Sequence, residues 1–319
     1  MIRINDLKSN KKYITLWYFV CMLFFSCSSS SDEVMVPGLH KGAKTPLMQS
    51  VADYMDKIQV VEKDSSYQLT EGLTITEVNF RYLTRPTRIF VAEIDLDKNL
   101  SVVTCTPNNE NIQDQPQVMP EQMIWAEKAG KDICVGVNGD FAGKYTDKNK
   151  LFTMNIFVKD GQILKETYYP GYEGLFVVLK NGESKIIHPK DFEGIKDDVL
   201  EAMGGYHSLV RDGEENKEMP VDDITMQFGP RTFVGLSKDN KKCFLFVIDG
   251  RQEGYSSGMR LEDVATLCKG AGCYNAINLD GGGSSTFVIK DKTGSFNVLN
   301  KPSDGQLRPV INGLVVIKK

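Results

Sequence analysis

Two stretches of this sequence, related by an offset of 142 residues, place similar residue types in the same order. "MPEQMIWAEKAGKDICVGVNGDF" begins at Met119, and "RLEDVATLCKGAGCYNAINLDGG" begins at Arg260. Each starts with an amphipathic run that ends at a glycine, and continues into a short apolar run that stops at Asn-Gly or Asp-Gly. The pattern predicts two helix-strand units, so the fold has to accommodate two similar sets of strand ends.

The segments before these units also correspond. "RIFVAEIDLDKN" from Arg88 matches "RTFVGLSKDNK" from Arg231 at an offset of 143, and the surrounding segments from Leu73 are rich in strand-forming residues. We therefore predict an α+β fold in which an internally duplicated domain forms curved, largely antiparallel sheets, each with a packed helix. The two similar halves would span about 73–145 and 220–319. The alternative is two ordinary strand-helix-strand units that resemble each other by chance.

The second unit runs into "AINLDGGGSSTFVIK", from Ala276 to Lys290. Two short apolar runs flank Asp280–Thr286, which predicts a tight turn at a sheet edge. One Asp-Gly pair would close such a turn, and further glycines add chain entropy that folding must remove. We infer that the backbone is left bare so that a ligand can approach its amide groups, which can form an anion-binding concavity.

Other polar residues lie at predicted strand ends. "CFLFVIDGRQEGYSSGM" delivers Asp249, Arg251 and Ser256, "FGPRTFVGL" begins its strand at Arg231, and "QLRPVINGLVVIKK" places Arg308 and Asn312 before the last strand. Taken singly, each is compatible with an ordinary turn or a solvated arginine. Together they suit a charged carbohydrate, because carboxylates can bind sugar hydroxyls and guanidinium groups pair with phosphate.

The motifs "NGDF", "GPRTFVGL", "VIDGRQEGYSSGMRLEDVATL", "NLDGGGSST" and "RPVINGL" occur in this order. From Leu73 to the C-terminus the chain resembles the phosphodiester glycosidase family, which includes the mannose 6-phosphate uncovering enzyme and bacterial relatives. The resemblance implies an α+β domain that hydrolyses a sugar from a glycosyl-1-phosphodiester, with neither cofactor nor metal expected. The implied catalytic residues are Asp280, Asp249 and Asp140, and the implied substrate-binding residues are Asn138, Arg231, Arg251, Ser256, Gly282, Ser284, Arg308 and Asn312.

Two other functions use the same residues. Asp140, Asp249, Asp280 and Asn138 would also suit a hard, oxygen-ligated cation in a metal-dependent phosphodiesterase. A non-catalytic, surface glycan-binding lipoprotein is the third hypothesis, for which the tyrosines of "ETYYPGYEG" could line one wall, unless they pack in a hairpin. The sequence departs from the family pattern at Ala142, where a second aromatic residue is common, and at Tyr206-His207, where a more apolar turn is expected.

The N-terminus has the features of a targeting segment. Residues 1–26 carry a net charge of +3 before the apolar run "YITLWYFVCMLFF", and Cys27 then precedes a serine-rich tract. We predict a lipoprotein signal peptide over 1–26, lipidation of Cys27, a flexible linker over 27–46, and a phosphodiester glycosidase-like domain over 47–319. The expected location is the cell envelope, lipid-anchored at the outer membrane or cell surface. A plain signal peptide or signal anchor, with Cys27 incidental, is the alternative.

Charge and cysteine usage narrow the partners. The whole chain has a formal net charge of −4, so nucleic acid is not an expected partner, and a glycan or glycosyl phosphodiester is. Five cysteines remain beyond residue 27, scattered within apolar runs. This placement predicts buried thiols rather than a disulfide framework or a zinc site, although a Cys268–Cys273 bridge is left open.

Overall fold

The computed structural model describes residues 40–111, 115–144, 150–220 and 222–319. The chain divides into two units, Met1–Pro37 and Gly38–Lys319, and the account below concerns the second. The predicted signal peptide and Cys27 lie outside the described residues. Within the described part of the chain, no helix has the length and apolar character needed to cross a membrane.

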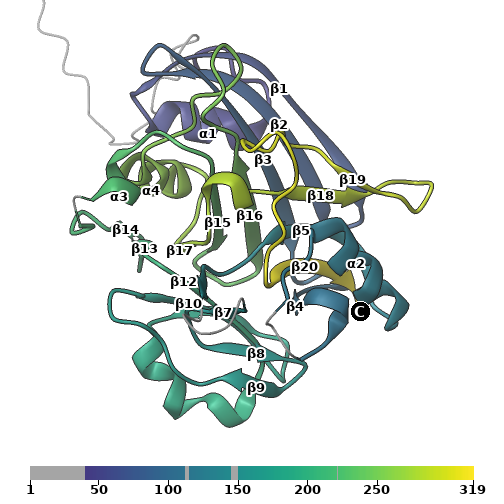
Figure 1. The fold of residues 1–319 in the computed structure, drawn as a ribbon. Coiled ribbons are helices and arrows are strands. Elements are labelled where there is room, and N and C mark those ends of the chain that lie inside the picture. The colour runs from purple at the N-terminus through teal and green to yellow at the C-terminus, as the bar shows by residue number, and fades with distance from the viewer. Residues whose placement is uncertain (1–39, 112–114, 145–149, 221) are drawn as a thin grey trace, which may run out of the picture. The chain divides into compact units, whose positions relative to one another are not determined.

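The largest sheet has eight strands in the order β1-β2-β3-β16-β15-β17-β13-β14, all in antiparallel pairs (Figure 1). Both faces of its central strands are buried. Phe233 and Phe246 face a core that includes helix α4, whereas Val234 and Val247 face a second core shared with the other sheets. The strands are β1 (Ile58–Thr70), β2 (Leu73–Tyr82), β3 (Arg85–Asp95), β13 (Ser208–Arg211), β14 (Glu214–Glu215), β15 (Arg231–Leu236), β16 (Lys242–Ile248) and β17 (Asn275–Asn278).

Two five-stranded sheets complete the core, and both are antiparallel. One has the order β19-β18-β5-β20-β4, with β4 (Leu100–Cys105), β5 (Asp132–Asn138), β18 (Phe287–Lys290), β19 (Phe296–Val298) and β20 (Gly313–Lys318). The other has the order β11-β10-β12-β8-β9, with β8 (Phe157–Lys159), β9 (Gln162–Lys165), β10 (Gly174–Leu179), β11 (Ser184–Ile187) and β12 (Val199–Gly205). A separate hairpin pairs β6 (Ala142–Lys144) with β7 (Leu151–Thr153).

Helices are few. Helix α4 packs on the largest sheet together with α1, and α2 packs on the sheet of β5 through Met119, Met123 and Ala126. The α-helices are α1 (Pro46–Tyr54), α2 (Met119–Lys128), α3 (Asp223–Met226) and α4 (Leu261–Gly270), and the 3₁₀ turns are η1 (Pro107–Asn109), η2 (Pro189–Gly194), η3 (Lys196–Asp198) and η4 (Gly282–Ser284). The fold is therefore mostly antiparallel sheet, as expected, but the third sheet, over β8–β12, was not foreseen.

The helix-strand units match in detail, but the strand order does not follow the sequence offset. Both α2 and α4 are followed by a glycine of positive φ, Gly130 at 98° and Gly272 at 90°. Strands β15 and β16 pair with each other, whereas β3 and β4 lie in different sheets. Instead β20 lies between β5 and β4, as β15 lies between β17 and β16. The internal duplication thus stays a prediction, because the hairpins that suggested it are not paired alike.

Three local expectations need correction. The segment Asp280–Thr286 is not a hairpin turn, because β17 and β18 belong to different sheets and the segment crosses between them. Residues 41–45 are not part of a linker, since Val61 donates to the carbonyl of Lys41 and Asp64 accepts from the amide of Thr45. Helix α4 is not capped by a serine, because its N-cap residue is Arg260.

The cysteine prediction is confirmed for the described residues. Cys105, Cys134, Cys243, Cys268 and Cys273 are all buried free thiols. No bridge joins Cys268 to Cys273.

Candidate active site

The ends of β5 and β17 meet, although they belong to different sheets. The amide of Asp280 donates to the carbonyl of Gly139 (2.9 Å), and Nδ2 of Asn138 donates to the carbonyl of Asp280 (2.6 Å). Oδ1 of Asn138 accepts from the hydroxyl of Thr232 (2.8 Å) and the amide of Thr286 (3.1 Å). Asn138 therefore ties three segments together, and this joint places Asp140 and Asp280 side by side.

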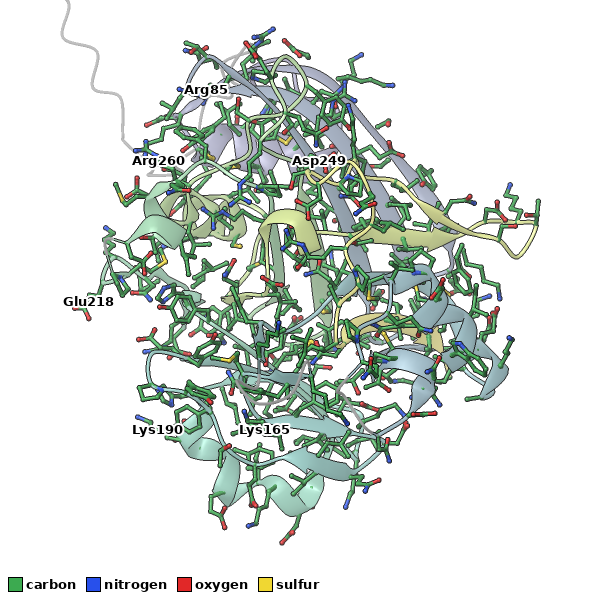
Figure 2. All side chains as sticks on the ribbon, viewed as in Figure 1. Arg85, Lys165, Lys190, Glu218, Asp249 and Arg260 are labelled. Carbon is green, nitrogen blue, oxygen red and sulfur yellow. The ribbon has the colours of Figure 1, made fainter. Side chains whose placement is uncertain are left out.

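The carboxylate of Asp140 is enclosed by donors from β7 and the following residues. It accepts hydrogen bonds from the hydroxyl of Thr153 and from the amides of Phe141 and Asn155 (2.8 Å each for the amides). Lys165, labelled in Figure 2, donates from Nζ to the carbonyl of Thr153 (2.7 Å). Burial nevertheless raises the pKa of Asp140 to about 7, and the nearby charge of Asp280 adds to that rise.

Asn312 holds the backbone at Asp140. Its Oδ1 accepts from the amide of Asp140 (2.8 Å), and its carbonyl accepts from the amide of Gly139 (3.1 Å). Asn312 is fully buried. We therefore expect it to position the acid rather than contact a ligand.

Asp280 is the accessible member of the acid pair, because its residue is only partly buried. Desolvation raises its pKa to about 6, while a hydrogen bond from Ser284 and the positive charge of Arg308 act in the opposite direction. Both acids thus have pKa values well above the ordinary value of 3.8. Two interacting carboxyl groups with different, raised pKa values are typical of acid–base chemistry near neutral pH.

Two arginines lie together beside this pair. Arg231 is buried and donates to the carbonyls of Met259 (3.0 Å) and Gln227 (2.7 Å), and its pKa is lowered to about 10 by burial and by Arg251. Arg251 is exposed, and among the described residues its guanidinium has no hydrogen-bond or ion-pair partner. Its backbone has a φ of 58°, an unusual conformation for an arginine. A free guanidinium on a strained backbone is typical of a site for an anion.

The three glycines after Asp280 each make room for a different group. A Cβ on Gly281 would lie 2.8 Å from the carbonyl oxygen of Pro230, and one on Gly282 would lie 3.0 Å from Nη1 of Arg251. A Cβ on Gly283 would overlap Nη2 of Arg308. The bare backbone thus brings two guanidinium groups directly over the turn. The close approach inferred from the sequence is real, but the groups that use it are the protein's own arginines.

Arg308 approaches the site from the segment before β20. It forms an ion pair with Asp304 (Nη2 to Oδ2, 2.6 Å) and remains exposed. Its charge also lowers the pKa of Asp280, so it lies near that carboxylate. Arg251, Gly282 and Arg308 therefore surround the accessible acid with positive charge.

The structure does not place Asp249 with the other two acids. Its carboxylate accepts from Nδ2 of Asn300 (3.0 Å), the amide of Lys301 (2.9 Å) and the hydroxyl of Tyr255 (3.1 Å), beside the C-terminal loop drawn in yellow (Figure 2). Ser256 is also enclosed, since its hydroxyl donates to the carbonyl of Asp249 (2.6 Å). We interpret both residues as supports of the loops around the site.

Comparison with known proteins was made against this geometry. Residues 131–317 match the family described as phosphodiester glycosidase, which is more than half of the chain. The chain belongs to the phosphodiester glycosidase family. The matched segment contains the acid pair and all three arginines of the site.

Relatives of this phosphodiester glycosidase domain are distant. A prophage-derived uncharacterized protein, YomE, of Bacillus subtilis is 29% identical over 51% of this chain and 25% of its own length. Mouse N-acetylglucosamine-1-phosphodiester alpha-N-acetylglucosaminidase is 28% identical over 41% of this chain and 20% of its own length. The alignments thus span a quarter or less of either relative.

Solved structures share the fold. The catalytic domain of zebrafish N-acetylglucosamine-1-phosphodiester alpha-N-acetylglucosaminidase, auto-inhibited by its pro-peptide, superposes with a TM-score of 0.59 at 20% identity, covering 82% of this chain and 89% of that one. A hypothetical protein from Synechocystis gives a TM-score of 0.57 at 12% identity, covering 82% of this chain and 65% of that one. At these identities the likeness establishes the architecture alone.

Several residues of the site escaped the sequence analysis. Thr153 and Asn155 reach Asp140 from beyond a long loop, and Thr232 reaches Asn138 from another sheet. No local pattern marks them, since each is a single polar residue in a short strand or beside one. Phe141 was the exception that could have been found, because it lies in the "NGDF" motif itself.

The oxygens expected to bind a cation are otherwise engaged. Oδ1 of Asn138 and both carboxylate oxygens of Asp249 accept hydrogen bonds from protein donors. Within the part of the chain that the structure describes, no three His, Cys, Asp or Glu side chains gather as metal ligands would. The described geometry therefore gives the metal-dependent hypothesis no ligand set of that kind.

Proposed function

We propose that this protein is a hydrolase that releases a sugar from a glycosyl-1-phosphodiester. The observation that carries the proposal is the pairing of Asp140 and Asp280 at two joined strand ends, where burial raises the pKa of both. Membership in the phosphodiester glycosidase family supports the same reaction class. Glycoside cleavage commonly uses two carboxyl groups, so the pair supplies the required chemistry.

The arginines suit the departing group. Arg251 and Arg308 are exposed guanidinium groups that lie over Gly282 and Gly283, next to the accessible carboxylate of Asp280. We assign them to the phosphate, with Arg231 behind Arg251 adding positive charge. Because a phosphate monoester is already a good leaving group, stabilising its charge can replace much of the assistance from a proton donor.

The proposed reaction breaks the bond between the anomeric carbon and the bridging oxygen. Asp280, which ligands can reach, acts at the anomeric carbon. Asp140 lies behind it, enclosed, and contributes to the electrostatics of the pair. Water supplies the new hydroxyl of the sugar, and the bridging oxygen leaves with the phosphate monoester.

Hydrolysis in heavy-oxygen water tests this assignment. We expect the label in the released sugar and none in the phosphate, and we expect Asp280→Asn to lower kcat about 100-fold or more while the variant stays folded. Asp291→Asn, on a remote surface loop, is the matched control and should keep full activity. Label in the phosphate would favour a phosphodiesterase, and the absence of turnover with every glycosyl phosphodiester would favour a glycan-binding protein.

We also propose that the protein acts at the cell envelope, anchored through lipid on Cys27. The support is the sequence alone: a cationic and apolar segment followed by Cys27 and a serine-rich tract. Metabolic labelling with a palmitate analogue should mark the wild type and leave Cys27→Ser unlabelled. Equal labelling of both would remove the proposal.

A further inference from the structure

Three aromatic rings form a group beside the acid pair, here called the aromatic wall: Phe141, Tyr172 and Tyr206. The ring centroids of Tyr172 and Tyr206 are 4.9 Å apart, and Phe141 lies 6.0 Å from Tyr172 and 5.8 Å from Tyr206. Each comes from a different part of the chain. Phe141 follows β5, Tyr172 precedes β10, and Tyr206 follows β12.

The aromatic wall is not part of the protein's core. None of its three residues belongs to the four hydrophobic clusters of the described chain, and Phe141 and Tyr206 are partly exposed. Rings that only stabilised the fold would be expected to join one of those clusters. Grouped aromatic rings that keep an accessible face are typical of binding surfaces.

The wall adjoins the acids on the side of Asp140. The amide of Phe141 donates to the carboxylate of Asp140 (2.8 Å). Burial raises the pKa of Tyr172, and the charges of Asp140 and Asp280 add to that rise, so its hydroxyl lies near both acids. Arg308, by contrast, acts on Asp280. The site thus has an aromatic flank toward Asp140 and a cationic flank toward Asp280.

The base of the wall is polar and incompletely hydrogen-bonded. The ring of His207 lies 3.8 Å from that of Tyr206, and His207 is only 1% exposed. Among the described residues, neither of its ring nitrogens has a hydrogen-bond partner, and neither does Oδ1 of Asn278, whose amide donates to the carbonyl of His207 (2.9 Å). Unpaired buried polar groups cost free energy, and they concentrate where a ligand or ordered water completes them.

We propose that the aromatic wall binds the sugar ring of the substrate, an inference that rests on the proposed glycosidase function. The apolar face of the pyranose stacks on Tyr206 and Phe141. Its anomeric carbon then points to Asp280, and the phosphate lies on the cationic flank at Arg251. The two flanks therefore fix the direction in which a glycosyl phosphodiester lies across the acid pair.

Competition experiments with the two halves of a substrate test this directly. Methyl α-glycosides of glucose, mannose and N-acetylglucosamine probe the aromatic flank, and inorganic phosphate probes the cationic flank, both by ligand-detected NMR on the full chain. We expect Tyr206→Ala to weaken binding of the preferred glycoside at least tenfold and to leave phosphate binding unchanged, whereas Tyr206→Phe retains both. Tyr67→Ala, which removes an exposed tyrosine of β1, is the matched control.

The kinetic counterpart separates this inference from the proposed function. With a turned-over glycosyl phosphodiester, Tyr206→Ala should raise KM at least tenfold and change kcat less than threefold, because stacking acts on the bound sugar in both ground and transition states. Turnover with unchanged glycoside binding in Tyr206→Ala would overturn the wall as sugar site. Equal loss of glycoside and phosphate binding would also overturn it, by indicating a general collapse of the site. Glycoside binding that depends on Tyr206 without any turnover would instead refute the hydrolase and leave the wall standing.

Discussion

Replacing Asp140 with asparagine should change how the stability of this protein depends on pH. The folded-state pKa of Asp140 is about 7, against an ordinary value of 3.8, because its carboxyl group is buried beside Asp280. The folded protein therefore favours the protonated acid. This contribution to stability is fully present below pH 3.8 and is lost as the pH rises through 7.

The size of the effect follows from the same values. A shift of about three pKa units corresponds to roughly 4 kcal/mol, of which about 3 kcal/mol is lost between pH 5 and pH 8.5. Asparagine has no charge to lose, so Asp140→Asn removes this part of the pH dependence. Relative to the wild type, the variant should gain about 3 kcal/mol of unfolding free energy between the two pH values, a figure good to order of magnitude.

Urea denaturation followed by circular dichroism at pH 5 and pH 8.5 measures this difference. Other titrating groups contribute equally to both proteins and cancel in the comparison. Asp291→Asn is the control: the pKa of Asp291 is lowered to about 2 by hydrogen bonds from Thr293 and Ser295, so it is ionised at both pH values. Its effect should be the same at each. If Asp140→Asn and the wild type lose stability in parallel, the argument from burial is refuted.

Three further predictions concern the surroundings of the acids. Arg251→Ala should lower kcat/KM about 100-fold with little change in Tm, since the exposed guanidinium has no partner among the described residues; steady-state kinetics and a thermal melt would test this, and Arg251→Lys should recover only part of the activity. Gly283→Ala should displace Arg308 and reduce kcat/KM at least about tenfold, and unchanged kinetics would contradict the close-approach argument. Asn312→Ala should cost about 1–3 kcal/mol in urea denaturation by leaving the amide of Asp140 unpaired, whereas an unaltered midpoint would show that the bond is dispensable.

Much of the local structure was readable from the sequence because it depends on local patterns. Pro120 near a helix start and Gly130 just past its end bounded α2 correctly, and the apolar runs from Leu73, Arg88 and Leu100 became β2, β3 and β4. The pairing of Asn138 with Asp280 was also anticipated as a meeting of two strand ends. The hydrogen bond between them joins residues 142 apart, which is the offset of the repeat.

The assignment of roles within the site needed the tertiary structure. Asp249, Asp140 and Asp280 look alike in sequence, since each follows or nearly follows an apolar strand. The fold surrounds Asp249 with Asn300, Lys301 and Tyr255, and leaves Asp280 accessible. Which carboxylate meets solvent depends on loops that return from distant parts of the chain, and no local pattern encodes their paths.

The sequence by itself therefore determined which residue types stand at the strand ends, because hydrophobic periodicity, helix stop signals and glycine placement act over a few residues. Only the tertiary structure decided which strands pair and which polar groups lose water. It placed β20, not β3, beside β5, and it brought Phe141, Tyr172 and Tyr206 together. Pairing and desolvation are properties of contacts between remote segments, and their free energies are set when the sheets pack.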